Sequence, residues 1–190
     1  MKSHVDNKIL GFDMDGVVIN NNPLKLEFAK KLGYKLKITQ TASEIIRKIL
    51  SPEDLKSLQT ALYHNLGVSM NADLMPGIVS LLSKIKERKI PYYLISRRAA
   101  PDIAIEYLKV KGLWPKYFNE SNAFFVVEPI EKNIKAKELG ITHYVDDETK
   151  ILNVLEDVPN KFLFDHMNVF PEGNYAKVTS HEELAKYFLW

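Results

Sequence analysis

Short, wholly apolar runs recur along the chain, and each is bounded by polar or turn-forming residues. A short apolar run that is rich in β-branched and aromatic residues is typical of a buried β-strand. Strands that are apolar on both faces belong to sheets that are covered on both sides. We therefore predict buried strands at residues 8–12, 90–96, 123–127, 142–147 and 161–164.

Between these runs, apolar residues recur every three or four positions, which is the spacing of one face of a helix. The helical patterns cover residues 78–85, 101–108, 132–139, 151–155 and 182–189. Strands that alternate with helices form a parallel sheet with helices on both faces. The predicted fold class is therefore α/β, with a doubly wound, Rossmann-like parallel sheet.

The segment after the first strand differs from the rest of the chain, because it carries helical patterns with no strand between them. These patterns cover residues 24–32, 45–50 and 52–66. We therefore predict a small α-helical cap that is inserted into the core after its first strand. The predicted boundaries are residues 20–74 for the cap, and residues 1–19 and 75–190 for the core.

The composition narrows the class of protein. The chain of 190 residues is 46% hydrophobic and 26% charged, with a formal net charge of +2 and no cysteine. Disulfides, thiolate zinc sites and cysteine nucleophiles are therefore excluded. The small net charge gives no reason to expect a nucleic acid polymer or a membrane as partner. Because the N-terminal sequence has no long apolar segment, we expect no signal peptide and a cytoplasmic protein; the oligomeric state is not predicted.

Polar residues cluster where the predicted strands end. Asp13 and Asp15 follow the first strand, Ser96 ends the second, and Asp146 and Asp147 end the fourth. Ligands of open α/β sheets bind beyond the carboxyl ends of the strands, so we expect these side chains to meet. Converging carboxylates repel one another and need a cation. Oxygen ligands without His or Cys favour a hard ion, and we predict Mg²⁺.

Two aspartates at such an edge can also carry out covalent chemistry. A carboxylate can act as a nucleophile and form an aspartyl-phosphate, and a second acid beside it can donate and accept protons. Residues i and i+2 of an extended strand point the same way, so Asp13 and Asp15 can share one site. Gly16 allows the chain to turn away directly after them.

Four motifs occur in the same order as in one known family. They are "DMDGV" at residues 13–17, "LIS" at 94–96, a downstream lysine, and "VDD" at 145–147. With these motifs the chain resembles the haloacid dehalogenase (HAD) superfamily of phosphotransferases, over residues 8–165. One class of that superfamily carries its cap directly after the first motif, which is where the helical insertion lies here.

The resemblance implies a role for each matching residue. Asp13 would attack phosphorus and bind Mg²⁺. Asp15 would protonate the leaving oxygen and then activate water, while its backbone carbonyl would contact the metal ion. Ser96 would donate a hydrogen bond to a phosphoryl oxygen. Asp146 and Asp147 would hold the metal ion, and we favour Asp147 as the direct ligand because it matches the aspartate of the family's Gly-Asp pair.

The position of the conserved lysine of the superfamily is open among three residues, namely Lys132, Lys135 and Lys137. The matching lysine would neutralise charge on the nucleophile and on the phosphate. It usually lies where a helix begins, near the carboxyl edge of the sheet. Lys132 follows the loop at residues 128–131 and best fits that place, with Lys135 as the alternative.

The stretch "EKNIKAKELGITHYVDD" at residues 131–147 resembles the small 5'-nucleotidases that are similar to the cytosolic deoxyribonucleotidases. This resemblance implies a nucleoside monophosphate as substrate. Arg97 and Arg98 follow Ser96 at the same edge, and they can bind a second phosphate or a carboxylate of the substrate. The alternative for each arginine is a solvated residue at a helix start.

The predicted function is that of a Mg²⁺-dependent phosphomonoester hydrolase with a small phosphorylated substrate. A phosphomutase or another phosphotransferase of the same superfamily is the first alternative, because it uses the same acids and differs in excluding water. A receiver-type regulatory domain, which binds phosphate and metal without turnover, is a weaker alternative. Its acceptor aspartate follows the third strand, whereas Asp13 follows the first, and it has no large helical insertion.

Overall fold

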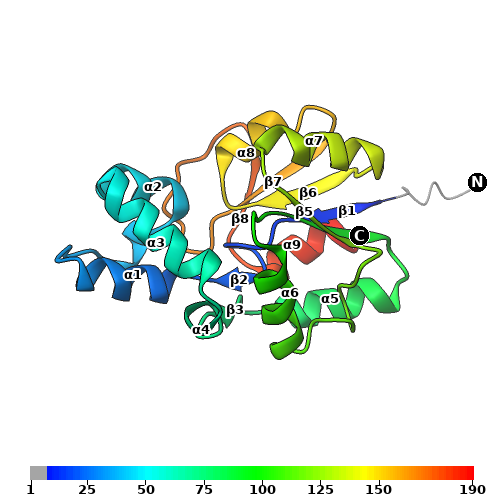
Figure 1. The fold of residues 1–190 in the computed structure, drawn as a ribbon. Coiled ribbons are helices and arrows are strands. Elements are labelled where there is room, and N and C mark those ends of the chain that lie inside the picture. The colour runs from blue at the N-terminus through cyan, green and yellow to red at the C-terminus, as the bar shows by residue number, and fades with distance from the viewer. Residues whose placement is uncertain (1–7) are drawn as a thin grey trace, which may run out of the picture.

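The computed structural model describes residues 8–190, and its centre is a sheet of six parallel strands (Figure 1). The strands lie in the order β5-β4-β1-β6-β7-β8, so the chain starts in the middle of the sheet and winds outward in both directions. This arrangement confirms the predicted doubly wound α/β fold. The strands are β1 (Leu10–Phe12), β4 (Tyr92–Arg97), β5 (Ala123–Val126), β6 (His143–Asp146), β7 (Asn160–Phe164) and β8 (Ala176–Val178).

Helices cover both faces of the sheet, in two layers that Figure 1 shows below and above it. One layer packs on Leu10, Phe12 and Leu94 and consists of α5 (Ile78–Glu87), α6 (Pro101–Val110) and α9 (His181–Phe188). The other layer packs on Ile95 and Tyr144 and consists of α7 (Pro129–Glu138) and α8 (Thr149–Val154). The apolar side chains of β1, β4 and β6 are therefore buried on both sides, as their sequences predicted.

The segment after β1 folds into a group of helices at one end of the sheet, on the left of Figure 1. We call this group the cap. Its helices are α1 (Asn22–Lys31), the 3₁₀ helix η1 (Ile38–Thr41), α2 (Ser43–Ile49), α3 (Pro52–His64) and α4 (Leu66–Ser69). They share a small apolar cluster of their own, made of Ala29, Ile46, Leu50, Leu58 and Leu62. The division into a cap domain and a core domain at the predicted boundaries stays a prediction.

Two strands at the base of the cap were not predicted. β2 (Ile19–Asn20) and β3 (Asp73–Leu74) form an antiparallel pair, which joins the two ends of the cap where the chain leaves and re-enters the core. An alternating pattern cannot be recognised here, because each strand has only two residues. The short edge strand β8 was missed for a similar reason, since only Val178 of its three residues is buried.

Several predicted elements have other bounds in the structure, and the helical pattern at 52–66 is divided into α3 and α4. Two of these differences concern the predicted site. The strand predicted at 142–147 ends at Asp146, so Asp147 lies beyond the sheet. The helix predicted at 132–139 begins earlier, at Pro129.

No helix among the described residues is long and apolar enough to cross a membrane. The expected absence of a signal peptide concerns in part residues 1–7, which lie outside the described residues. That expectation and the cytoplasmic location stay predictions.

Candidate active site

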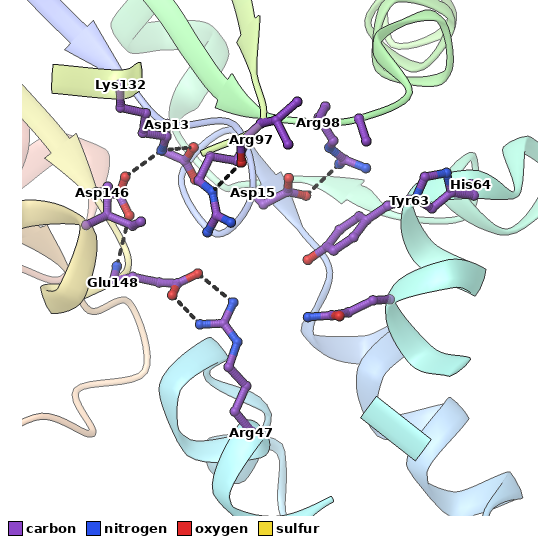
Figure 2. Close-up of a pocket in the computed structure, with 14 residues that line it drawn as sticks. Asp13, Asp15, Arg47, Tyr63, His64, Arg97, Arg98, Lys132, Asp146 and Glu148 are labelled. Carbon is purple, nitrogen blue, oxygen red and sulfur yellow. Dashed lines mark hydrogen bonds and ion pairs between the residues drawn. The ribbon is translucent and has the colours of Figure 1, made fainter. Parts of the chain in front are cut away.

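The ends of β1 and β6 and the start of α7 bring one lysine between two aspartates (Figure 2). The Nζ atom of Lys132 donates to Oδ1 of Asp13 over 2.6 Å and to Oδ2 of Asp146 over 2.8 Å. All three residues are buried, and Lys132 is only 1% exposed. A buried charge is stable only with partners of opposite charge, so these three side chains form one electrostatic unit.

The start of α7 explains how Lys132 reaches the acids. Pro129 occupies the first turn, where it costs no hydrogen bond, and Glu131 bonds back to the backbone nitrogen of Glu128 over 2.7 Å. Lys132 therefore lies in the first turn, beside the carboxyl edge of the sheet. Lys135 pairs instead with Glu138, and Lys137 pairs with Asp157. Of the three candidate lysines, only Lys132 contacts the predicted acids.

A third aspartate joins Asp13 and Asp146 in a group that fits a hard metal ion. One carboxylate oxygen from each of Asp13, Asp146 and Asp147 lies within 4.8 Å of the other two. Asp147 packs directly against Gly16, because a Cβ atom on Gly16 would lie 2.4 Å from the carboxyl carbon of Asp147. The donors are oxygens only, so the group fits Mg²⁺. The three acids that the sequence proposed as metal ligands through their side chains therefore do meet.

We expect Gly16→Ala to weaken Mg²⁺ binding about tenfold or more and to destabilise the protein by about 1–2 kcal/mol. The new Cβ atom would push Asp147 away from Asp13, and the backbone at residue 16 has φ +79°. Titration calorimetry with Mg²⁺ and denaturant unfolding measure the two effects. Gly33→Ala is the matched control, because Gly33 has φ +90° but nothing within 4 Å. Equal metal affinity in both variants would contradict the expectation.

Asp15 lies beside this group and lines the same cavity as Asp13, but it faces different partners. Its Oδ1 atom accepts from Nδ2 of Asn21 over 2.6 Å and from Nη2 of Arg98 over 2.7 Å. Asn21 stands at the entry to the cap, and Arg98 follows β4. The second aspartate is therefore held through one oxygen, which leaves its other oxygen free to exchange a proton.

The two arginines after Ser96 have separate positions. Arg97 lines the cavity, and its Nε atom donates to the backbone oxygen of Val127 over 3.1 Å. Arg98 is 6% exposed, and its guanidinium lies 4.3 Å from the centre of the Tyr63 ring in α3 (Figure 2). The alternative of a solvated residue is therefore wrong for Arg98. Ser96 is fully buried, its hydroxyl has no partner among the described residues, and it does not line the cavity.

The cavity that these residues enclose has a volume of about 270 Å³. Its core side carries Asp13, Asp15, Arg97, Arg98, Lys132 and Asp146, and its cap side carries Arg47, Gln59, Tyr63 and His64. Figure 2 shows Arg47 and Tyr63 of the cap pointing toward the core residues of the cavity. The cavity is thus a polar space between core and cap, of the size that suits a small, charged ligand.

Several contacts between cap and core involve residues that the sequence did not single out. Arg47 of α2 binds both carboxylate oxygens of Glu148. The hydroxyl of Ser43 donates to Oδ2 of Asp147 over 2.8 Å. Glu148 follows the two predicted aspartates and could have been considered with them. Nothing in the sequence marks Arg47 or Ser43, because a partner about 100 residues away is fixed only by the tertiary fold.

Burial and mutual repulsion shift the pKa values of this group. Burial raises the pKa of Asp146 to about 7, although Lys132 acts against it, because one ammonium cannot neutralise two carboxylates. Burial also raises the pKa values of Asp13 and Asp147. Burial acts to lower the pKa of Lys132, but Asp13 and Asp146 outweigh it and hold that pKa well above its usual value. The acids therefore need a further cation to be fully ionised.

We expect the metal-free protein to lose stability as the pH rises from about 4 to about 7. The folded protein binds the proton of Asp146 at a pKa of about 7, compared with 3.8 for the free side chain, so this proton stabilises the fold at low pH only. Asp146→Asn keeps a neutral group at all pH values. The free energy of unfolding of Asp146→Asn, measured relative to that of wild type, should therefore increase by roughly 2–4 kcal/mol as the pH rises from about 4 to about 7.

Denaturant unfolding in EDTA at several pH values measures this difference. His166 and His181, whose pKa values burial lowers, change stability in the opposite sense, but they are present in both proteins and cancel. Parallel pH profiles of wild type and Asp146→Asn would contradict the raised pKa.

No protein-family model and no curated protein matches the chain. Solved structures do match it along most of its length. A protein from Thermotoga maritima that is described as a β-phosphoglucomutase has a TM-score of 0.64 at 18% identity, over 95% of this chain and 97% of that one. A subfamily IA HAD hydrolase from Geobacter sulfurreducens has a TM-score of 0.62 at 16% identity, over 95% of this chain and 98% of that one.

A HAD-family hydrolase from Deinococcus radiodurans, solved with bound phosphate and sodium, has a TM-score of 0.60 at 15% identity, over 95% of this chain and 94% of that one. At these identities the comparisons show a shared fold. The chain has the fold of HAD-superfamily hydrolases, and the narrower resemblance to small 5'-nucleotidases stays a prediction.

Proposed function

We propose that this protein is a Mg²⁺-dependent phosphomonoester hydrolase that works through an aspartyl-phosphate on Asp13. The observation that carries the proposal is the position of Asp13. It lines a cavity of small-ligand size and contacts a buried lysine, and its carboxylate belongs to a group of three that fits a metal ion. The match in fold to HAD-superfamily hydrolases supports the same chemistry.

In the first step, a carboxylate oxygen of Asp13 attacks phosphorus, and the bond between phosphorus and the leaving oxygen breaks. Asp15 gives its proton to that leaving oxygen. Lys132 holds the other side of Asp13 and offsets negative charge as the phosphoryl group arrives. Bound Mg²⁺, held by Asp13, Asp146 and Asp147 and by the backbone carbonyl of Asp15, would supply positive charge against the phosphoryl oxygens.

In the second step, water attacks the phosphorus of the aspartyl-phosphate, and Asp15 takes a proton from it. The bond between phosphorus and Asp13 breaks, which releases inorganic phosphate and restores the carboxylate. Asn21 and Arg98 orient Asp15 for both proton transfers through one of its oxygens. The cap lies across the cavity from these acids and would exclude bulk water.

Three further residues are proposed to bind the substrate. The buried hydroxyl of Ser96 lacks a partner among the described residues. Ser96 does not line the cavity in this arrangement of cap and core, so the proposal requires the phosphoryl group to reach past the lining residues to that hydroxyl. Arg97 lines the cavity and makes no ion pair among residues 8–190, so it can bind a second anionic group. Nε and Nη1 of Arg98 are buried and have no hydrogen-bond partner within residues 8–190, so they can donate to the same anionic group.

The substrate that we propose is a small phosphorylated molecule, and a nucleoside monophosphate is the first candidate from the sequence resemblance. Tyr63 is the aromatic residue of the cavity that could stack on a base, but Arg98 already covers one face of its ring. The cavity volume of about 270 Å³ suits a small ligand. Sugar phosphates and phosphorylated acids, which need no aromatic stacking, are therefore tested as alternative substrates beside the nucleotides.

A phosphomutase is the second candidate, since one protein with the same fold is described as a β-phosphoglucomutase. A mutase would return the phosphoryl group of Asp13 to another oxygen of the substrate. The two functions differ in the release of inorganic phosphate.

The test is phosphate release from a panel of nucleoside monophosphates, sugar phosphates and phosphorylated acids, with Mg²⁺ and with EDTA. The hydrolase proposal predicts Mg²⁺-dependent release, and a maximum on a nucleotide would support the nucleotidase. A maximum rate on another ester would exclude the nucleotide as the preferred substrate and would still support the hydrolase. Isomerised ester without phosphate release would favour the mutase. Binding of phosphate and metal without turnover would favour a regulatory module.

A further inference from the structure

A second buried lysine lies near the acidic group, and it comes from the cap. Lys25 of α1 is 6% exposed. Its Nζ atom donates to the hydroxyl of Ser43 over 3.0 Å, and no ion pair joins it to a carboxylate among residues 8–190. An ammonium group has three protons to donate, and Lys25 makes one hydrogen bond to a neutral group where Lys132 makes two to carboxylates.

The position of Lys25 relates it to the predicted metal ligands. The same Ser43 hydroxyl that accepts from Lys25 donates to Oδ2 of Asp147 over 2.8 Å. One hydroxyl group therefore separates the ammonium from a carboxylate of the metal group. Burial lowers the pKa of Lys25, while the negative charges of Asp147, Asp15 and Glu148 act to raise it.

Attachment of the cap does not require this lysine. Other contacts of α2 with the β6–α8 loop and with the start of α8 already join cap and core, since Arg47 binds Glu148 and Glu44 accepts from Oγ1 of Thr149 over 2.7 Å. A buried ammonium with one hydrogen bond costs stability, and an apolar side chain of similar length would avoid that cost. The structure therefore places a costly charge one hydroxyl group away from Asp147, beside the acids where a divalent cation is expected to bind.

We propose that Lys25 is a cap-borne cation that sets the charge balance of the site, opposing the divalent metal ion and favouring the phosphate group. The proposal rests on the metal site of the proposed function. In this arrangement of cap and core, Lys25 repels the metal ion across the Ser43 hydroxyl, which weakens metal binding to the free protein. The negative charge of a phosphate ester offsets this repulsion, so the metal ion binds most tightly when substrate is present.

The test uses two binding measurements on the metal-free full chain at pH 8. Titration calorimetry with Mg²⁺ alone should show about tenfold tighter binding to Lys25→Met than to wild type, because repulsion at this range is large inside a protein. Inorganic phosphate without metal should bind about threefold or more weakly to Lys25→Met. Lys30→Met is the matched control, since Lys30 lies exposed on the same helix, and both affinities should equal those of wild type.

The opposite signs of the two changes separate an effect of charge from structural damage, which would weaken both. Thermal unfolding checks that Lys25→Met folds, and Lys25→Gln replaces it in the same titrations if it does not. Equal or weaker Mg²⁺ binding in the Lys25 variant overturns the inference while the metal site stands. Failure of wild type and variant alike to bind Mg²⁺ overturns the proposed metal chemistry, and the inference with it.

Discussion

Asp13→Asn should lower the rate of phosphate release at least about a thousandfold on the best ester of the panel. The amide cannot attack phosphorus as the carboxylate does, and removing a nucleophile abolishes the covalent route. The substitution preserves shape, and Lys132 keeps its bond of 2.8 Å to Asp146. The variant should therefore fold with a stability equal to or above that of wild type. Initial rates with saturating Mg²⁺ measure the effect.

Asp102→Asn is the control for this experiment, because Asp102 is exposed in the first turn of α6. It makes the same chemical change away from the cavity and should keep the wild-type rate. If Asp13→Asn keeps a tenth of the wild-type rate or more, the nucleophile has been assigned to the wrong residue.

Lys132→Met should have the second large effect, and it acts on both stability and activity. Removing the ammonium leaves Asp13 and Asp146 buried side by side without the positive charge that pairs with both, and Asp146 keeps only its hydrogen bond from the backbone nitrogen of Glu148. Breaking a buried ion pair in this way costs about 3–5 kcal/mol. We expect a loss of about 3 kcal/mol in the metal-free protein by denaturant unfolding, and a drop in rate of about a hundredfold or more.

Added Mg²⁺ should recover part of that stability, since a cation at the three acids replaces the missing charge. Lys135→Met provides the comparison, because Lys135 lies one turn further along α7 and pairs with the exposed Glu138. It should change stability by less than about 0.5 kcal/mol. A Lys132 variant as stable and as active as the Lys135 variant would contradict the assignment of the site.

The sheet and its functional edge could be predicted because both depend on local sequence. Short apolar strands that alternate with helices specify a parallel sheet, and the carboxyl ends of its strands necessarily meet at one edge. Asp13, Asp146 and Asp147 therefore came together as expected. Lys132 could be preferred over Lys135 because the start of a helix lies near that edge.

The contacts made by the cap could not be predicted, because they depend on how one helical group docks on the sheet. Lys25 and Arg47 lie in ordinary helical patterns, and Ser43 lies just before one. The partner of Lys25 is fixed when α1 meets α2 inside the cap, and those of Ser43 and Arg47 when α2 meets the β6–α8 loop. Arg98 illustrates the same limit. From sequence it could equally be solvated or buried, and the ring of Tyr63 from the cap decides between the two.

The central claim is that Asp13 carries the phosphoryl group, and the most direct test is to trap that intermediate. Wild-type protein is quenched with acid during turnover of its best substrate, and the peptide that contains Asp13 is analysed by mass spectrometry. The account predicts one added phosphoryl group on Asp13, which hydroxylamine removes and which Asp13→Asn lacks. Steady release of phosphate from a protein that never carries this group on Asp13 would contradict it.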